Sequence, residues 1–168
     1  MVRKISVISL FSAFAILASY IETFIPSIGI PGVKLGLANI MVVLALFLLD
    51  SESAIIIDVV RIVIVGLLFG NIFSISFALA GAFVSLTVMI ILRKVFDFSI
   101  ITVSIFGGFF HNVGQIIVAF ILVDSYSVFG YLPVLLITGI ITGLIIGILA
   151  KILYERTSML CKKILKDY

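Results

Sequence analysis

The stretch from residue 53 to residue 92 constrains this chain more than any other feature, because it is almost continuously apolar. Asp58 and Arg61 are its only charged residues. The stretch is about twice as long as the roughly 20 apolar residues that one helix needs to cross a bilayer. A soluble domain carries about 25% charged residues, whereas this chain carries 11%. The sequence therefore predicts an integral membrane protein, and it excludes a soluble enzyme, a nucleic-acid-binding domain and a disordered chain.

Charged residues, glycines and prolines divide the apolar sequence into six predicted transmembrane helices. These cover residues 5–24, 34–49, 53–70, 73–92, 99–122 and 130–150. Gly70 and Asn71 are expected to form the tight turn that divides the long apolar stretch. Arg3 and Lys4 resemble the start of a signal peptide, but the apolar run behind them is long, so we expect an uncleaved helix. The prediction is a single all-α membrane domain over residues 1–168.

The basic residues of the predicted loops are distributed asymmetrically, which indicates how the chain crosses the membrane. With the N-terminus inside, the basic residues on the cytoplasmic side are Arg3, Lys4, Arg93, Lys94, Lys151, Arg156, Lys162, Lys163 and Lys166. Lys34 alone falls outside, and Arg61 falls within a span. Because cytoplasmic loops are enriched in Lys and Arg, we expect an even number of spans and both termini in the cytoplasm. The basic tail, residues 151–168, is expected to lie on the anionic inner leaflet.

Asp58 and Arg61 lie inside a predicted span, where charged residues are rare. They are three residues apart, so they share one face of a helix. An isolated charge at the centre of a bilayer costs roughly 2.5–3.5 kcal/mol, and an ion pair reduces that cost. Two interpretations stay open: the pair is a structural element between helices, or Arg61 contacts an anionic ligand or a neighbouring helix in a regulated way.

His111, Asn112 and Gln115 form the densest polar group in the predicted spans, within the sequence GGFFHNVGQ. His111 and Gln115 are four residues apart and share a helix face. Three such side chains within a membrane need hydrogen-bond partners. They either hold helices together or form part of a ligand pocket, and the pocket is the interpretation that we favour. One histidine with two amides is a poor ligand set for zinc or copper, so we expect no metal.

Residues 25–34 form an unusual loop after the first predicted span. Pro26 and Pro31, together with the neighbouring glycines, exclude a simple helix, yet the segment stays apolar. A rigid, apolar, external loop is typical of a lid over a pocket. Lys34 would begin the second span, and Asn39 would lie about one turn deeper. Alternatively, the segment is a tight connection whose Lys34 extends to the lipid head groups.

Small residues recur at four-residue spacing in the first and sixth predicted spans. Gly139, Gly143 and Gly147 form a smooth strip that favours close helix packing, more often inside one chain than between two. The first span holds two similar pairs, Ser9 with Ala13 and Ala15 with Ser19. We interpret these pairs as a docking face for another membrane protein or as ordinary packing.

The motifs of ATPases and common hydrolases are missing from the sequence. It has no glycine-rich phosphate loop ending in Lys-Ser/Thr, no Gly-x-Ser-x-Gly and no His-Glu-x-x-His. It also has no paired aspartates of the kind that hold Mg²⁺ against a diphosphate. Cys161, the single cysteine, permits no internal disulfide and has no nearby histidine to activate it. We therefore expect a binding or transport subunit that is not an enzyme and needs no cofactor.

Four groups of residues carry a resemblance to a known family over nearly the whole chain. They are PGVKLGLAN at residues 31–39, Arg61 with Gly66 and Phe69-Gly70, HNVGQ at residues 111–115, and Tyr131-Leu132-Pro133 with Gly139 and Gly143. This pattern resembles the Gx transporter family, which is also called heptaprenyl diphosphate synthase component I. That family is in turn similar to the substrate-binding S components of energy-coupling factor (ECF) transporters, which are six-helix membrane proteins with both termini inside.

The resemblance to S components implies a site, partners and a location. A lid over residues 25–34 would close over a small substrate in the cell membrane of a prokaryote. The implied ligand-binding residues are Lys34, Asn39, Arg61, His111, Asn112 and Gln115. The first helix would meet a transmembrane coupling protein, joined to two cytosolic ATPases, through Ser9, Ala13, Ala15 and Ser19. Each of these pairs has a serine where the family motif has alanine.

Three functions stay open at the level of sequence. The one that we favour is an S-component-like subunit that binds a small organic micronutrient for uptake, and Lys34 and Arg61 would suit an anionic group on it. The second, implied by the synthase label, is a non-catalytic membrane subunit in heptaprenyl diphosphate or quinone biosynthesis. The third is a structural subunit of a larger redox or transport complex.

Overall fold

A computed structural model describes residues 2–24, 35–123 and 126–166 of the protein. These residues form six α-helices and one short 3-10 helix, and the described ranges contain no β-strand. The elements are α1 (Val2–Phe24), α2 (Asn39–Leu48), α3 (Ser51–Phe69), α4 (Ile72–Lys94), α5 (Ile100–Val123), η1 (Tyr126–Tyr131) and α6 (Leu132–Lys166). The predicted all-α fold is confirmed.

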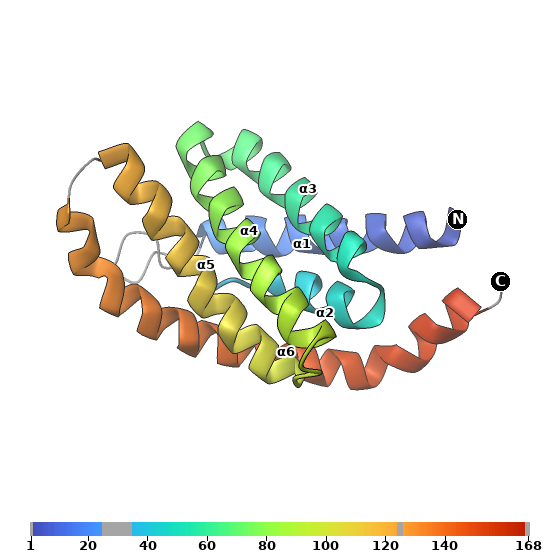
Figure 1. Cartoon of the computed structure of the whole chain (residues 1–168). Coiled ribbons are helices and arrows are strands. Elements are labelled where there is room, and N and C mark those ends of the chain that lie inside the picture. The colour runs from blue at the N-terminus through green and yellow to red at the C-terminus, as the bar shows by residue number, and fades with distance from the viewer. Residues whose placement is uncertain (1, 25–34, 124–125, 167–168) are drawn as a thin grey trace.

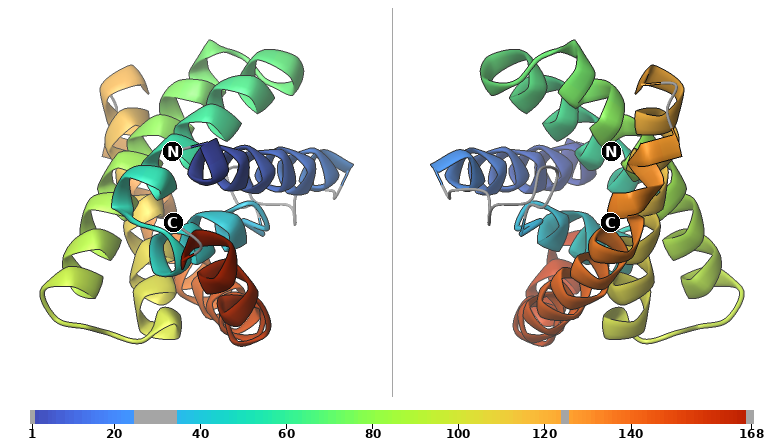
Figure 2. Two further views of the ribbon diagram at one scale, coloured as in Figure 1. Left: turned by 90° about the vertical axis from the view of Figure 1, so that its right-hand side faces the viewer. Right: turned by 90° about the vertical axis from the view of Figure 1, so that its left-hand side faces the viewer.

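The helices run back and forth between two ends of an elongated bundle (Figure 1). The start of α1, the α2–α3 and α4–α5 connections and the end of α6 lie toward one end, which we call the terminal end. The end of α1, the α3–α4 turn and the start of α6 lie toward the opposite end (Figure 1). α4 and α5 lie on one side of the molecule and α1 on the other (Figure 2). Both described ends of the chain therefore lie at the same end of the bundle.

Four of the helices are long and apolar enough to cross a membrane, so the chain has the architecture of a multi-pass membrane protein. The candidate spans are Arg3–Phe24, Ile72–Lys94, Ile100–Leu122 and Phe129–Met159. α3 has 19 residues and is not among these spans, because it carries three charged residues, Glu52, Asp58 and Arg61. α6 has 35 residues, about 52 Å, and therefore extends well beyond a hydrocarbon core of about 30 Å.

The second predicted span, residues 34–49, needs a correction. The observed helix α2 begins only at Asn39 and has 10 residues, about 15 Å, which is half of what a membrane crossing requires. Gly36 explains the late start, because its φ of +77° is left-handed and its carbonyl accepts from the Asn39 N–H. The apolar composition was interpreted as lipid contact, whereas α2 is enclosed by protein.

α2 lies at the centre of the hydrophobic core. Its residues from Val42 to Leu46 are at most 4% exposed. They pack in one cluster with buried side chains from the surrounding helices, among them Ala15, Ile57, Leu86, Val103 and Ile146. Irregular backbone within a membrane protein is tolerated where it is buried in protein or lines a cavity, and residues 35–38 fulfil this condition.

The glycine strip of α6 packs inside the chain, as predicted, and its partner is α5. A Cβ atom on Gly139 would lie 2.6 Å from the Gly108 carbonyl oxygen, and one on Gly143 would lie 2.6 Å from the Ser104 carbonyl oxygen. The Ser104 hydroxyl also donates to the Gly143 carbonyl over 2.7 Å. The backbones of the two helices thus approach each other more closely than side chains would allow.

The predicted turn at Gly70 and Asn71 is confirmed, and Asn71 caps α4. Its side-chain oxygen accepts from the Ser74 N–H over 2.9 Å, while the Ser74 hydroxyl accepts from the Asn71 N–H over 2.9 Å. This reciprocal capping box satisfies two N–H groups that the helix itself leaves without partners.

Asp50 caps α3 in a similar way and ties it to α1. Its carboxylate accepts from the Ser53 N–H over 2.8 Å and lies 2.7 Å from the Lys4 ammonium group. Burial acts to raise the pKa of the Asp50 carboxyl, but hydrogen bonds from Lys4 and Ser53 outweigh it, and the pKa is lowered from its usual value. The connection between α2 and α3 is thereby held against the start of α1.

Apart from Arg61 in the middle of α3, the basic residues with described side chains belong to segments at or toward the terminal end. They are Arg3, Lys4, Arg93, Lys94, Lys151 and Arg156. Lys34 lies outside the described residues, and the side chains of Lys162, Lys163 and Lys166 are not described. The charge asymmetry that underlies the predicted orientation is therefore also an asymmetry in space.

Candidate functional site

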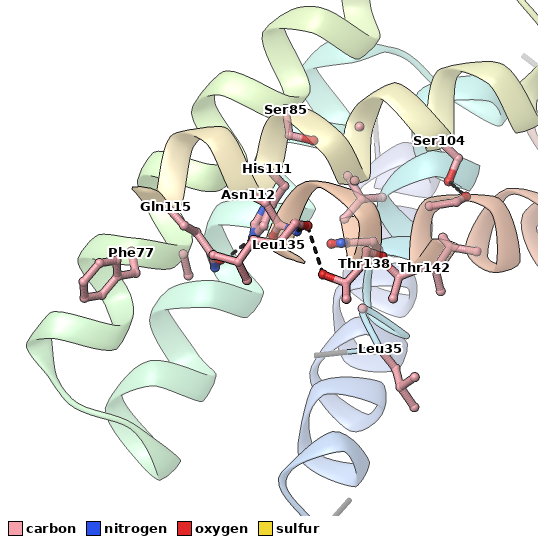
Figure 3. Close-up of a pocket in the computed structure, with 18 of the residues that line it drawn as sticks. Leu35, Phe77, Ser85, Ser104, His111, Asn112, Gln115, Leu135, Thr138 and Thr142 are labelled. Carbon is pink, nitrogen blue, oxygen red and sulfur yellow. Dashed lines mark hydrogen bonds between the residues drawn. The ribbon is translucent and has the colours of Figure 1, made fainter. Parts of the chain in front are cut away.

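A cavity of about 710 Å³ lies inside the bundle (Figure 3). Residues of all six α-helices line it, and Leu35 and Gly36 contribute from the segment before α2. Much of the wall is apolar, with Val42, Val43, Phe77, Met89, Ile116 and Ile146 among its residues. Small-molecule sites in proteins have volumes of about 300–1,000 Å³ and mainly apolar walls with a few polar groups. The cavity has both properties.

One side of the cavity carries an ionic group built from α2 and α3. The Arg61 guanidinium lies 2.7 Å from the Asp58 carboxylate, and it donates through Nη2 to Asn39 Oδ1 over 2.8 Å. The side chains of Arg61 and Asp58 are 14% and 4% exposed. The predicted pairing of Asp58 with Arg61 is present, and Asn39 extends it to the start of α2. The pair neutralises two charges that would otherwise be costly at this depth.

The other side carries the polar group of α5. Gln115 Nε2 lies 3.2 Å from His111 Nε2, so these two side chains contact each other along one helix face (Figure 3). Asn112 donates to the Leu135 carbonyl in the first turn of α6, and the Thr138 hydroxyl donates to the same carbonyl over 2.9 Å. Asn112 thus holds two helices together and lines the cavity at the same time.

A glycine on α4 creates the space that the His111 ring occupies. A Cβ atom on Gly81 would lie 2.7–2.9 Å from three atoms of that ring. Because carbon atoms do not approach so closely, a larger residue at position 81 would displace the ring. The position of His111 therefore depends on a residue of the neighbouring helix.

Glu22 connects the end of α1 to the cavity. Its carboxylate accepts from the backbone N–H of Leu37 over 2.9 Å, which fixes the irregular segment ahead of α2. Glu22 also lines the cavity. Glu22 is not among the site residues predicted from the sequence, although a lone acidic residue inside an apolar helix is itself a signal of function.

The structure brings together five of the six predicted ligand-binding residues. Asn39, Arg61, His111, Asn112 and Gln115 all line the cavity. Lys34 and the predicted lid, residues 25–34, lie outside the described residues.

Several lining residues were not predicted from sequence. They are Ser74, Ser85, Ser104, Tyr131, Thr138 and Thr142, together with Glu22. Serine and threonine give a weak signal, because in membrane helices their hydroxyl groups bond to the backbone of the preceding turn, as Thr142 does with Thr138.

Metal binding and cysteine chemistry find no support in the part of the chain that the structure describes. No group of three or more His, Cys, Asp or Glu side chains there could hold a metal ion. Cys161 is buried, and burial raises the pKa of its thiol, which disfavours the reactive thiolate.

The two small-residue pairs of α1 lie in different environments. Ser9 and Ala13 are exposed, but Ala15 and Ser19 are 0% and 7% exposed and face the bundle. Residues six positions apart point about 120° away from each other around a helix, so the two pairs cannot share one surface. Ala15 belongs to the hydrophobic core, where α2 and α3 cover this side of α1.

The fold and the cavity define a class: a helical, multi-pass membrane protein with a cavity inside its bundle. The family model described as heptaprenyl diphosphate synthase component I matches residues 11–153. The chain therefore belongs to this family, as its motifs indicated. No curated protein and no solved structure matches the sequence.

Proposed function

We propose that the protein is the substrate-binding membrane subunit of an ECF-type transporter and holds a small organic micronutrient in its central cavity. One observation carries this proposal. An ion pair, two asparagines, a glutamine and a histidine from α2, α3 and α5 surround a single cavity. Such groups are costly within a membrane and are typical of substrate pathways.

The proposal includes an orientation and a set of partners. The terminal end, with its basic residues, faces the cytoplasm, because positive charge is retained on that side. The energy for uptake comes from two cytosolic ATPases through a transmembrane coupling protein. The exposed face of α1, with Ser9 and Ala13, is the surface that we assign to this coupling protein.

A second candidate function follows from the description of the family. In that case the chain is a non-catalytic membrane subunit of a heptaprenyl diphosphate synthase, and its partner is the other component of that synthase. The cavity would then have a supporting role in prenyl diphosphate or quinone metabolism.

Native mass spectrometry distinguishes the two candidates. The protein is purified gently from its own membrane, and bound small molecules and partner subunits are recorded together. The transport proposal expects a stoichiometric small molecule, a coupling protein and two ATPases. A soluble prenyl synthase in place of the ATPases contradicts it and supports the second function.

A further inference from the structure

Three hydroxyl groups around the cavity donate their protons to carbonyl groups of the protein. The Ser104 hydroxyl donates to the Gly143 carbonyl, Thr138 to the Leu135 carbonyl, and Thr142 to the Thr138 carbonyl, over 2.7–2.9 Å. A hydroxyl group has one proton and two lone pairs, so each of these oxygens is left as an acceptor. Toward a ligand, this part of the wall therefore accepts hydrogen bonds.

The nitrogen groups of the wall are also engaged within the protein. Arg61 donates through Nε to Asp58 and through Nη2 to Asn39, over 2.8 Å in both cases. Asn112 donates from its amide nitrogen to the Leu135 carbonyl. Its side-chain oxygen takes no part in this bond and is an acceptor. These bonds hold α2, α3, α5 and α6 in position, and the remaining N–H groups of Arg61 take part in none of them.

The charge of the described lining also favours a ligand that donates hydrogen bonds over an anion. Among the described lining residues there are two carboxylates, Glu22 and Asp58, and one guanidinium, Arg61. With His111 neutral, the formal charge of this lining is −1. Arg61 is paired with Asp58, so the carboxylate without an opposite charge in the described lining is Glu22. A diphosphate needs several cations or an array of N–H donors, whereas the one cation of the described lining, Arg61, is already paired with Asp58.

We infer that the cavity selects an uncharged or singly cationic molecule rich in N–H or O–H donors, such as an amine or an amino-substituted heterocycle, and rejects prenyl diphosphates and other polyanions. Donors on the ligand would satisfy the acceptors of Glu22, Asn112 and the threonines, while its apolar part contacts the aliphatic wall. This inference rests on the proposed binding function. It replaces the expectation that Arg61 recognises an anionic group.

The first test is the chemical identity of the molecule that co-purifies with the full chain. Native mass spectrometry with fragmentation of the released ligand gives its formula and ionisable groups. We expect a neutral or singly cationic compound with several N–H or O–H groups and no phosphate. A phosphate or diphosphate ester bound in the cavity overturns the inference, although it leaves a binding function intact.

The second test uses four probes of similar size and different charge: benzylamine, benzyl alcohol, benzoate and benzyl phosphate. Each is added to the ligand-free protein in detergent, and the shift of the unfolding temperature is measured. Benzylamine and benzyl alcohol should stabilise the protein, and the two anions should not. A larger shift with either anion overturns the inference.

A substitution at Glu22 makes the second test specific to the cavity. Glu22→Gln keeps an oxygen for the Leu37 N–H but removes the charge, so benzylamine should bind about tenfold more weakly while benzyl alcohol is unaffected. Glu52→Gln is the matched control, because Glu52 is exposed on α3 and does not line the cavity. Equal losses in both variants contradict the inference. If no probe shifts the unfolding temperature and no molecule co-purifies, the proposed binding function fails, and this inference fails with it.

Discussion

The guanidinium of Arg61, in the middle of α3, donates a hydrogen bond over 2.8 Å to the side-chain oxygen of Asn39, the first residue of α2. Arg61 also donates a hydrogen bond to the carboxylate of Asp58, which lies on the same helix. A single side chain thus neutralises a buried carboxylate and fixes the point at which the short central helix begins. Both contacts border the cavity, so the ion pair supports the shape of the site.

Removing one partner of this ion pair should destabilise the protein more than removing both. Arg61→Met leaves Asp58 buried without a countercharge, and the expected loss is about 3–5 kcal/mol in the free energy of unfolding. The double variant with Asp58→Asn removes that penalty and should regain much of the stability. Denaturant unfolding in detergent measures both. Arg156→Met, at an exposed position, is the control, and equal stability of the single and double variants would contradict the prediction.

Gly81→Ala should displace the His111 ring. The added Cβ atom would lie 2.7–2.9 Å from the ring, so we expect a loss of about 1–3 kcal/mol in stability and weaker ligand binding. The matched control is Gly130→Ala, since a Cβ atom there would meet nothing within 4 Å. Unfolding temperature and retained ligand are measured on the same preparations. Indistinguishable results for the two variants would show that the ring does not depend on Gly81.

Gln115→Leu should separate binding from stability. The substitution keeps a side chain of similar size but removes the amide next to His111, so we expect at least about tenfold weaker binding. The protein should still migrate as a monodisperse peak on size-exclusion chromatography. Thr87→Val, on an exposed face of α4, should keep full binding. A folded Gln115→Leu protein with full ligand occupancy would indicate that this polar group only holds helices together.

Asp50 should make stability depend on pH in acid. Its pKa is lower in the folded protein than in the unfolded chain. The stability that its charge contributes is therefore complete above the unfolded pKa of about 3.9 and is lost as the pH falls through the folded pKa. The stability difference between wild type and Asp50→Asn should therefore be constant from pH 7 to about pH 5 and shrink toward pH 3. Lys4→Met should reduce this difference above about pH 5, where Asp50 is charged, because Lys4 is one cause of the shift. A difference that grows as the pH falls would contradict the assignment.

The sequence predicted the polar parts of the site because amides and charges stand out within apolar helices. Arg61, His111, Asn112 and Gln115 are conspicuous for this reason, and all four line the cavity. The serines and threonines are not conspicuous, since a hydroxyl group in a membrane helix can bond to the backbone whether or not a ligand is nearby. Glu22 could have been found by the argument that identified Arg61.

The length of α2 and the faces of α1 could not be predicted with the same arguments. An apolar stretch such as residues 40–48 has the same composition whether it contacts lipid or protein, so hydropathy does not distinguish a span from an enclosed helix. Gly36 was the local signal for the late start of α2. Its left-handed backbone, however, is a property of the fold and is not visible in the sequence. Likewise, Ala15 is buried because α2 and α3 pack against that side of α1. The spacing of small residues within α1 does not indicate where those helices pack.

The shortness of α2 has a consequence for how the protein is made. A helix of about 15 Å cannot enter a bilayer stably on its own, yet α2 is synthesised before most of the helices that enclose it. It reaches its final environment only when α3 to α6 have assembled around it. The centre of the molecule is thus among its first parts to be translated, and its enclosure is completed only after α6 has been made.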